Sequence, residues 1–239
     1  QQAMALTQEC INQQKKRNAK SWSEGLFDDD LCILRQQLAD QLMRYADWLC
    51  RDNDQQELIC LPSIEAARQI QEGVLAEYER HSEVRHCAIL RSRMAVAMQL
   101  SIDLLCREAY LLREKFTREE SQAAADEGLA HTATQITGQR ARERLGQAER
   151  RILALRELIE KEHLFGKTVS LLWIVNDEVW SVRQCDRQLS YVQDLAREWD
   201  GEEDEEMEEA EWTKPRRRTR RGKRRRGKGS EERRSGEAG

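Results

Sequence analysis

The stretch Ile59-Cys60-Leu61-Pro62-Ser63 contains one of only two prolines in this 239-residue chain, and the other is Pro215. Proline removes a backbone hydrogen-bond donor and clashes with the preceding turn, so it costs a helix interior about 3 kcal/mol. The long proline-free segment after Pro62 therefore predicts long helices. Leu61 should be extended because it precedes a proline. Ser63 is placed to cap a major helix over about 63–125.

Apolar residues recur at alternating spacings of three and four in two long segments. This spacing is typical of a coiled coil or of the seam of a helix bundle. One seam lies in the major helix, and the other lies in a third helical zone over about 148–200. Both are too long to stay exposed, so we expect them to pack against partner helices, of the same chain or of another. The predicted interface residues are Cys87, Leu90, Met94, Met98, Ile102, Leu105, Leu112, Phe116, Val175, Val179, Val182, Leu189, Val192 and Trp199.

The beginning of the chain predicts an arm followed by a first helix. Residues 1–29 are polar and are expected to be extended, whereas leucines at helical spacing predict a helix over about 30–51, started by the acids of residues 28–30. Trp22, Leu26 and Phe27 in the arm are expected either to anchor on a partner or to dock back onto the chain's own helices. Docking back is the favoured interpretation.

Glycines mark where the long helices should bend. Residues 117–147 are polar and alanine-rich and include Gly128, Gly138 and Gly146. Each interior glycine costs a helix about 1 kcal/mol relative to alanine, so we expect a reversal at Gly128 or Gly138. A further break is expected near Gly166. The sequence thus predicts an all-α fold over 30–200, as a helical hairpin, an elongated bundle or a coiled coil.

The last segment, 201–239, is acidic and then basic. Residues 201–211 are rich in acids and residues 214–228 are rich in bases. Neither run can bury a core, so both are predicted to be disordered. The basic run predicts non-specific polyanion binding to RNA, DNA or the acidic surface of tubulin, without base stacking because it holds no aromatic residue. A nuclear-import-like signal and a solubilising tail are the alternatives. The predicted polyanion-binding residues are Arg216, Arg217, Arg218, Arg220, Arg221, Lys223, Arg224, Arg225 and Arg226.

The composition argues against an enzyme, a metal protein and a membrane protein. The chain is 35% charged and 5% aromatic, and it has no phosphate-binding or nucleophile motif, so we expect no catalytic residue and no cofactor. His81, His86 and Cys87 come nearest to a metal cluster, but helical residues five apart do not share a face. Seven widely spaced cysteines predict free thiols in a reducing compartment. No apolar run approaches the roughly 20 residues of a membrane span.

The segment from Leu34 to Phe116 resembles the axonemal inner-arm dynein light chain family. A Leu-x-x-Gln-Leu element at residues 34–38 precedes Ile59-Cys60-Leu61-Pro62, and residues 85–93 follow at the family's distance. Two departures are the proline, displaced by one residue, and His86, which stands in place of a glycine. The resemblance implies a long helix that binds the tail of a dynein heavy chain. It also implies actin as a partner and the axoneme of a cilium or flagellum as the location.

The leading functional hypothesis is therefore a non-catalytic structural or adaptor subunit of a large assembly. Self-association of the chain through the two apolar seams is a further possibility that the sequence leaves open. The alternative is a peripheral subunit of an organellar ribosome or another RNA assembly, anchored by the basic run. Residues 1–23 contain one acid, Glu9, among several bases, which resembles the remnant of a mitochondrial import segment. That alternative implies a mitochondrial location.

Overall fold

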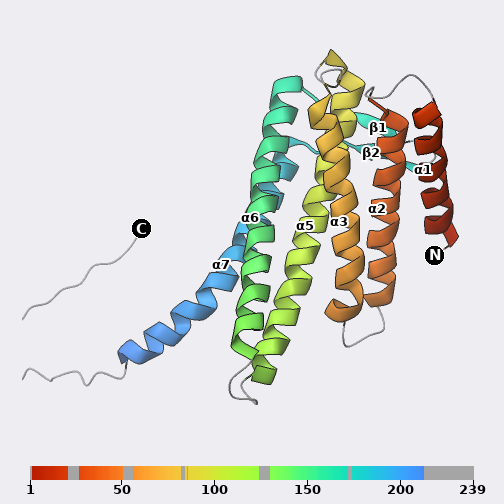
Figure 1. Cartoon of the computed structure of the whole chain (residues 1–239). Coiled ribbons are helices and arrows are strands. Elements are labelled where there is room, and N and C mark those ends of the chain that lie inside the picture. Colours follow the sequence, from red (N-terminus) through yellow and green to blue (C-terminus); the bar gives the residue numbers. More distant parts are fainter. Residues whose placement is uncertain are drawn as a thin grey trace, which may run out of the picture. The chain divides into compact units, whose positions relative to one another are not determined.

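The computed structural model describes residues 2–20, 27–50, 56–81, 84, 86–123, 130–171 and 174–212. The elements are α1 (Gln2–Lys20), α2 (Asp29–Cys50), α3 (Gln56–Arg80), α5 (Ala88–Ala123), α6 (Ala130–Glu162), β1 (Thr168–Leu171), β2 (Ile174–Glu178) and α7 (Val182–Trp212) (Figure 1). The all-α class is confirmed, with one short antiparallel pair of strands added. The chain forms two compact units, residues 1–200 and 201–239, and the bundle described below is the first.

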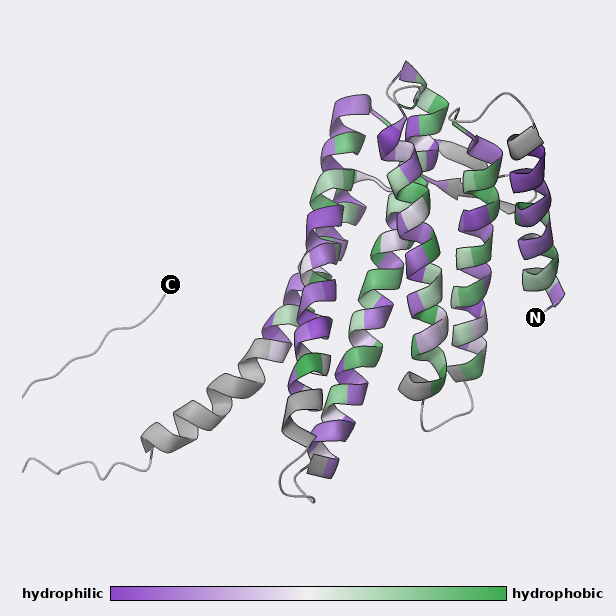
Figure 2. Cartoon of the chain, in the orientation of Figure 1, coloured by the Kyte–Doolittle hydropathy of each residue, from purple (hydrophilic) through white to green (hydrophobic). Residues whose placement is uncertain are grey.

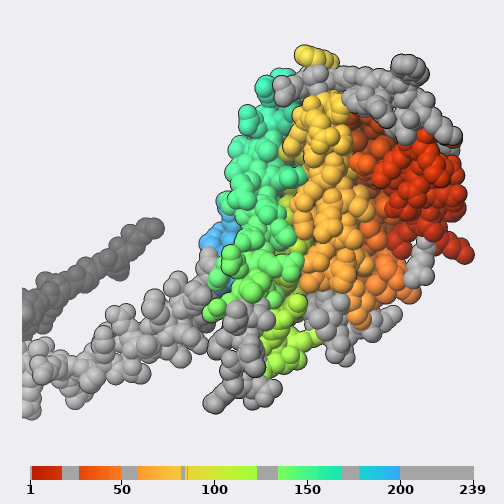
Figure 3. Space-filling model, in the orientation of Figure 1, coloured from red at the N-terminus to blue at the C-terminus, as the bar shows by residue number. Residues whose placement is uncertain are grey.

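Consecutive helices of the bundle pack as antiparallel neighbours. In this way α2 packs on α3, α3 on α5, and α5 on α6, while α1 covers the outer side of α2 (Figure 1). The outer helix α1 is largely hydrophilic, whereas α2, α3 and α5 carry more hydrophobic residues (Figure 2). Helices α1, α2, α3 and α6 lie side by side on the face shown in Figure 3. Helix α5 is the central element, because it packs against α3 and α6 and also contacts α2 and β1.

The continuous helix expected over 63–125 is instead two helices, α3 and α5, separated between Arg80 and Ala88. No proline or glycine marks this break. Val84 is buried between the two helices, and its N–H donates to the carbonyl of His81 at 3.3 Å. The reversal lets α3 and α5 bury their apolar stripes against each other. This burial decides the fold, because each large apolar side chain contributes about 1.5–3 kcal/mol when removed from water.

Pro62 lies inside α3 rather than ahead of it. The helix begins at Gln56, so Ser63 does not cap it, and Leu61 is helical rather than extended. Proline here removes one helical hydrogen bond and strains the turn before it. Cys60, Leu61 and Ile64, all buried in the core, offset that cost by the area they remove from water.

The N-terminal segment is helical where an extended arm was expected. Thr7 and Ile11, one turn apart in α1, are buried against the bundle, and the Gln14 side-chain amide donates to Asp28 at 3.3 Å. The predicted start of the next helix holds, since the Asp28 carboxylate accepts the N–H of Leu31 at 2.9 Å. Phe27 docks back onto the chain, with ring centroids 5.3 Å from Tyr78 and 5.4 Å from His81. Trp22 and Leu26 lie outside the described residues.

The reversal expected after the major helix falls between Ala123 and Ala130, a segment that includes Gly128. Gly138 is instead an interior residue of α6, at a close contact between helices. A Cβ atom there would lie 3.1 Å from the Phe116 ring and 3.7 Å from the Trp199 ring. The glycine that resembles a helix breaker in the sequence therefore permits close packing of α5, α6 and α7.

The zone expected to be helical over 148–200 contains a β-hairpin between α6 and α7. His163 and Gly166 adopt the left-handed conformation, with φ of 50° and 68°, and end the helical path. Strands β1 and β2 then pair with Thr168 opposite Glu178. Their residues include several β-branched types, which favour strands. Helix α7 continues to Trp212 and so includes the acidic run that was predicted to be disordered, while 213–239 lie outside the described residues.

A single glutamine ties this hairpin to the central helix. The Gln99 side-chain amide nitrogen donates to the carbonyl of Glu178 at 3.2 Å, and its carbonyl accepts the backbone N–H of Trp180 at 3.1 Å. At the other end of the bundle, the Trp199 ring packs on Phe116 with centroids 5.5 Å apart. The segment that leads into α7, and α7 itself at Trp199, are thus both attached to α5.

Two glycines of α6 should respond oppositely to substitution. Gly138→Leu should lower the free energy of unfolding by about 1–3 kcal/mol, because the side chain overpacks the Phe116 contact. Gly146→Ala should raise it by about 0.5–1 kcal/mol, because its Cβ would meet only Arg150 Nη1, at 3.7 Å, and alanine favours the helix. Urea unfolding followed by circular dichroism measures both. Equal shifts in the two variants would contradict the close packing at Gly138.

Candidate functional site: a buried charge network and a polar pocket

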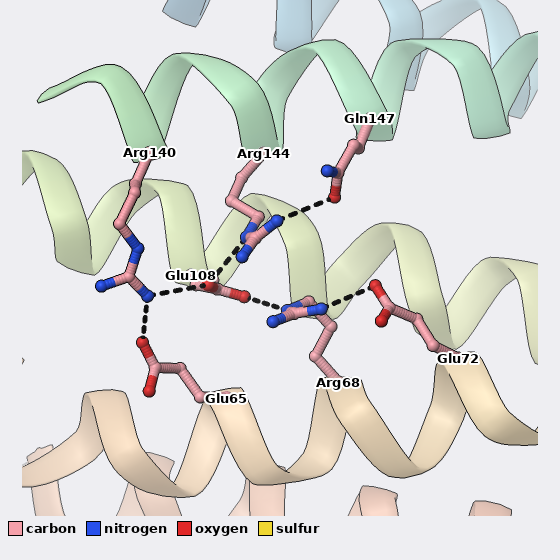
Figure 4. A network of polar contacts seen from close by, with 7 residues as sticks. All are labelled: Glu65, Arg68, Glu72, Glu108, Arg140, Arg144 and Gln147. Carbon is pink, nitrogen blue, oxygen red and sulfur yellow. Dashed lines mark hydrogen bonds and ion pairs between the residues drawn. The ribbon is translucent and has the colours of Figure 1, made fainter. Parts of the chain in front are cut away.

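Glu108, a carboxylate with a fully buried side chain, lies at the centre of the bundle. One of its oxygens accepts from Arg68 Nε of α3, and the other accepts from Arg144 Nε of α6 at 2.8 Å (Figure 4). Arg140 Nη2 of α6 lies 3.9 Å from that second oxygen. Because burying an ionised carboxylate costs several kcal/mol, these arginines are required for the charge to stay in the core.

Each arginine is held in turn by a partner nearer the surface. Arg68 donates to Glu72 at 2.6 Å, Arg140 to Glu65 at 2.5 Å, and Arg144 to Gln147 at 3.1 Å (Figure 4). Burial by itself would lower the pKa of Arg68, but the hydrogen bond to Glu72 and the charges of Glu108 and Glu72 raise it. Three carboxylates and three guanidinium groups make the network neutral in total.

The network is suited to holding the helices together rather than to proton transfer. Both oxygens of Glu108 accept hydrogen bonds from guanidinium groups, which stay protonated in proteins. The geometry fixes the register of three helices, since a shift of one turn in α3 or α6 would leave the Glu108 charge without its partner.

A pocket of about 500 Å³ lies on another side of α5, between α2, α3 and α7. Arg107 of α5 forms an ion pair with Asp47 of α2 across it. Burial raises the pKa of the Asp103 carboxyl to about 6, although the positive charge of Arg107 opposes this. The pocket is lined by Ala46, Asp47, Cys60, Ile64, Asp103, Cys106, Arg107, Tyr110, Leu111 and Tyr191.

The side chains predicted to form a partner-helix interface lie in the chain's own core. Met98, Ile102, Leu105, Leu112, Val179, Val192 and Trp199 are buried there. Leu90, Met94, Phe116, Val182 and Leu189 are partly buried against it, and Cys87 is half-buried. The side chain of Val175 is not among those described. For the described residues, then, the stripes pair within the chain.

The predicted polyanion-binding residues have no structural description. Arg216, Arg217, Arg218, Arg220, Arg221, Lys223, Arg224, Arg225 and Arg226 all lie outside the described residues.

The cysteines and histidines differ in one respect from the expectation. Cys60 is disulfide-bonded, whereas free thiols were predicted throughout. Cys10, Cys32, Cys87, Cys106 and Cys185 are free. His81 lies 3.4 Å from the Glu77 carboxylate, and His86 is exposed. Within the described ranges, no group of three potential ligands is placed to hold a metal ion.

Sequence reasoning missed both the network and the pocket. One signal was present: Glu108 interrupts an apolar stripe at a position where Leu105 and Leu112 face the core. A charge at such a position predicts a buried partner, but the identity of that partner depends on which helices come together. The position of Arg144 opposite Glu108 follows only from the antiparallel packing of α5 and α6.

No family model matches the chain, and neither the curated proteins nor the solved structures include a significant match. In the described part of the chain, no helix is long and apolar enough to cross a bilayer.

Replacing Glu108 should destabilise the fold far more than replacing its outer neighbour. Glu108→Gln leaves Arg68, whose side chain is 9% exposed, without its buried counter-charge, and should cost about 3–5 kcal/mol. The matched variant Glu72→Gln removes a carboxylate that is 40% exposed and should cost about 1 kcal/mol or less. Chemical denaturation measures both. Similar losses would show that Glu108 is not the centre of the network.

Proposed function

We propose that this chain is a non-catalytic structural or adaptor subunit of a large assembly, and that it meets its partner as an already folded bundle. Two features support the proposal. The apolar stripes and the buried charges are used to hold the chain's own helices together. Large apolar side chains remain on the outside, where they favour association with another protein.

The observation that carries the proposal is an aromatic patch at one end of the α2–α3 hairpin. Trp48 is 64% exposed and stacks on Tyr45, with ring centroids 6.1 Å apart and ring planes 21° apart. Ile59, which is 39% exposed, lies on the other side of the connection between the two helices. Tryptophan and tyrosine are the residue types that contribute most at protein interfaces. We call Tyr45, Trp48 and Ile59 the α2–α3 aromatic patch.

The sharpest form of the proposal is a subunit similar to an inner-arm dynein light chain. The resembling segment, Leu34 to Phe116, includes the whole α2–α3 aromatic patch. In this proposal the patch binds the heavy-chain tail, because the apolar stripes of α3 and α5 are already buried in the core. Actin and an axonemal location come with this form of the proposal.

A second candidate is a subunit of an RNA-containing assembly, such as an organellar ribosome. It rests on the basic run 214–228, whose arginines would contact phosphates with strong dependence on salt. A mitochondrial location belongs to this candidate.

Removing the exposed indole should weaken partner binding. When the tagged full chain is isolated from its own cells, Trp48→Ala should reduce the recovered partner at least tenfold, because central aromatic residues at interfaces contribute about 2 kcal/mol or more. Leu6→Ala, at an equally exposed apolar residue of α1, is the matched control and should change little. Quantitative mass spectrometry measures recovery and identifies dynein heavy chains or ribosomal proteins. Undiminished recovery with Trp48→Ala would overturn the role of the patch.

Deleting residues 214–228 separates the two candidates. An adaptor that binds through the α2–α3 aromatic patch should remain in its assembly after the deletion, whereas an RNA-anchored subunit should be released. Co-sedimentation of the deleted chain with the assembly at two salt concentrations measures this. Release by the deletion, combined with normal sedimentation of Trp48→Ala, would favour the RNA assembly over the adaptor.

A further inference from the structure

The pocket between α2, α3, α5 and α7 has a carboxylate without a partner. Among the described residues, Asp103 has no hydrogen bond or ion pair. Its nearest opposite charge is Arg107, one helical turn later, which is already paired with Asp47. The lining therefore carries two carboxylates and one guanidinium, an excess of one negative charge. A half-buried carboxylate in this position is incompletely solvated, and the nearby charge of Arg107 compensates it only in part.

The remaining walls suit a short hydrocarbon stem with a positive end. Ile64 and Leu111 supply aliphatic surface, and Tyr110 and Tyr191 are about half exposed on opposite helices, α5 and α7. Tyrosine rings attract cations through the negative potential of their faces. A volume of about 500 Å³ is within the range of small-ligand pockets.

We propose that this pocket binds an organic cation, a primary ammonium or guanidinium group on a short aliphatic stem, with Asp103 as its counter-ion. The cation supplies the direct ion pair that Asp103 lacks, because Arg107 is paired with Asp47. The stem packs against Leu111 between the two tyrosines. A free alkylamine and the lysine or arginine side chain of another protein share this chemistry. The inference does not depend on the proposed adaptor function, since it rests on residues outside the α2–α3 aromatic patch.

The proposal implies a definite pH dependence. The ionisable groups that face Asp103 are Asp47 on α2, Cys106, Arg107 and Tyr110 on α5, and Tyr191 on α7. Burial raises the pKa of Cys106 to about 11, and the neighbouring Glu114 raises that of Tyr110, so neither ionises near neutral pH. Asp103, with a pKa of about 6, is mostly ionised at pH 7 and mostly protonated at pH 5. Cation binding should therefore strengthen as pH rises through 6.

Titration of the full chain with butylammonium chloride tests the proposal. Binding is followed by NMR chemical shifts at constant ionic strength, with sodium butyrate as the matched anion. Butylammonium should bind about tenfold more tightly at pH 7 than at pH 5, the ratio of the ionised fractions of an acid with a pKa of about 6. Butyrate should not bind. A capped tripeptide with a central lysine distinguishes the source, because a pocket that serves protein side chains should accept it as well as the free amine.

Two variants give the matched comparison. Asp103→Asn should weaken butylammonium at pH 7 at least tenfold and remove the pH dependence. Asp194→Asn makes the same change of charge at an α7 carboxylate that pairs with Arg197 and should leave binding intact. The wild-type pH profile tests the proposal even if a variant folds poorly. Equal binding of butylammonium and butyrate, equal binding at the two pH values, or unchanged binding by a folded Asp103→Asn would each overturn it.

Discussion

A single buried carboxylate constrains how the helices of this bundle meet. The ionised side chain of Glu108 has no access to water, so arginines from α3 and α6 must reach it from opposite sides. Apolar packing alone tolerates small sliding of one helix along another. The hydrogen bonds to Glu108 do not, because the penalty for an uncompensated charge exceeds the gain from most alternative contacts. The network thus restricts the helix register to one that brings Arg68 and Arg144 to Glu108.

The apolar part of the bundle obeys a second constraint, which is the approach distance between helices. Gly138 lets α6 lie against Phe116, and Trp199 closes the same contact from α7. The guanidinium groups of Arg113 and Arg142 lie 5.8 and 5.9 Å from the centre of the Trp199 ring, so the indole is covered by cations. Charged and apolar contacts therefore alternate along α5 instead of occupying separate regions.

Much of the helical content could be predicted from the sequence, because stripe spacing and the aspartate cap at residue 28 are local signals. The break after Arg80 could not, since it depends on the area that α3 and α5 bury against each other. Pro62 was a misleading signal for the same reason: burial of its neighbours outweighs a local preference. The hairpin between α6 and α7 is held by Gln99, a residue distant in sequence. The network and the pocket combine side chains from three or more helices, so neither leaves a contiguous motif.

The attachment of α7 has a consequence for motion. Gln99 holds the segment that leads into this helix, and the Trp199 contact holds a position near residue 200, while the residues between them form one wall of the pocket through Tyr191. The part of α7 between these two attachments can detach as one cooperative unit, with an opening free energy below that of global unfolding. Amide hydrogens of α7 would then exchange together and ahead of those in α5. The pocket would open and close with them, so its accessibility is set by the local stability of one helix.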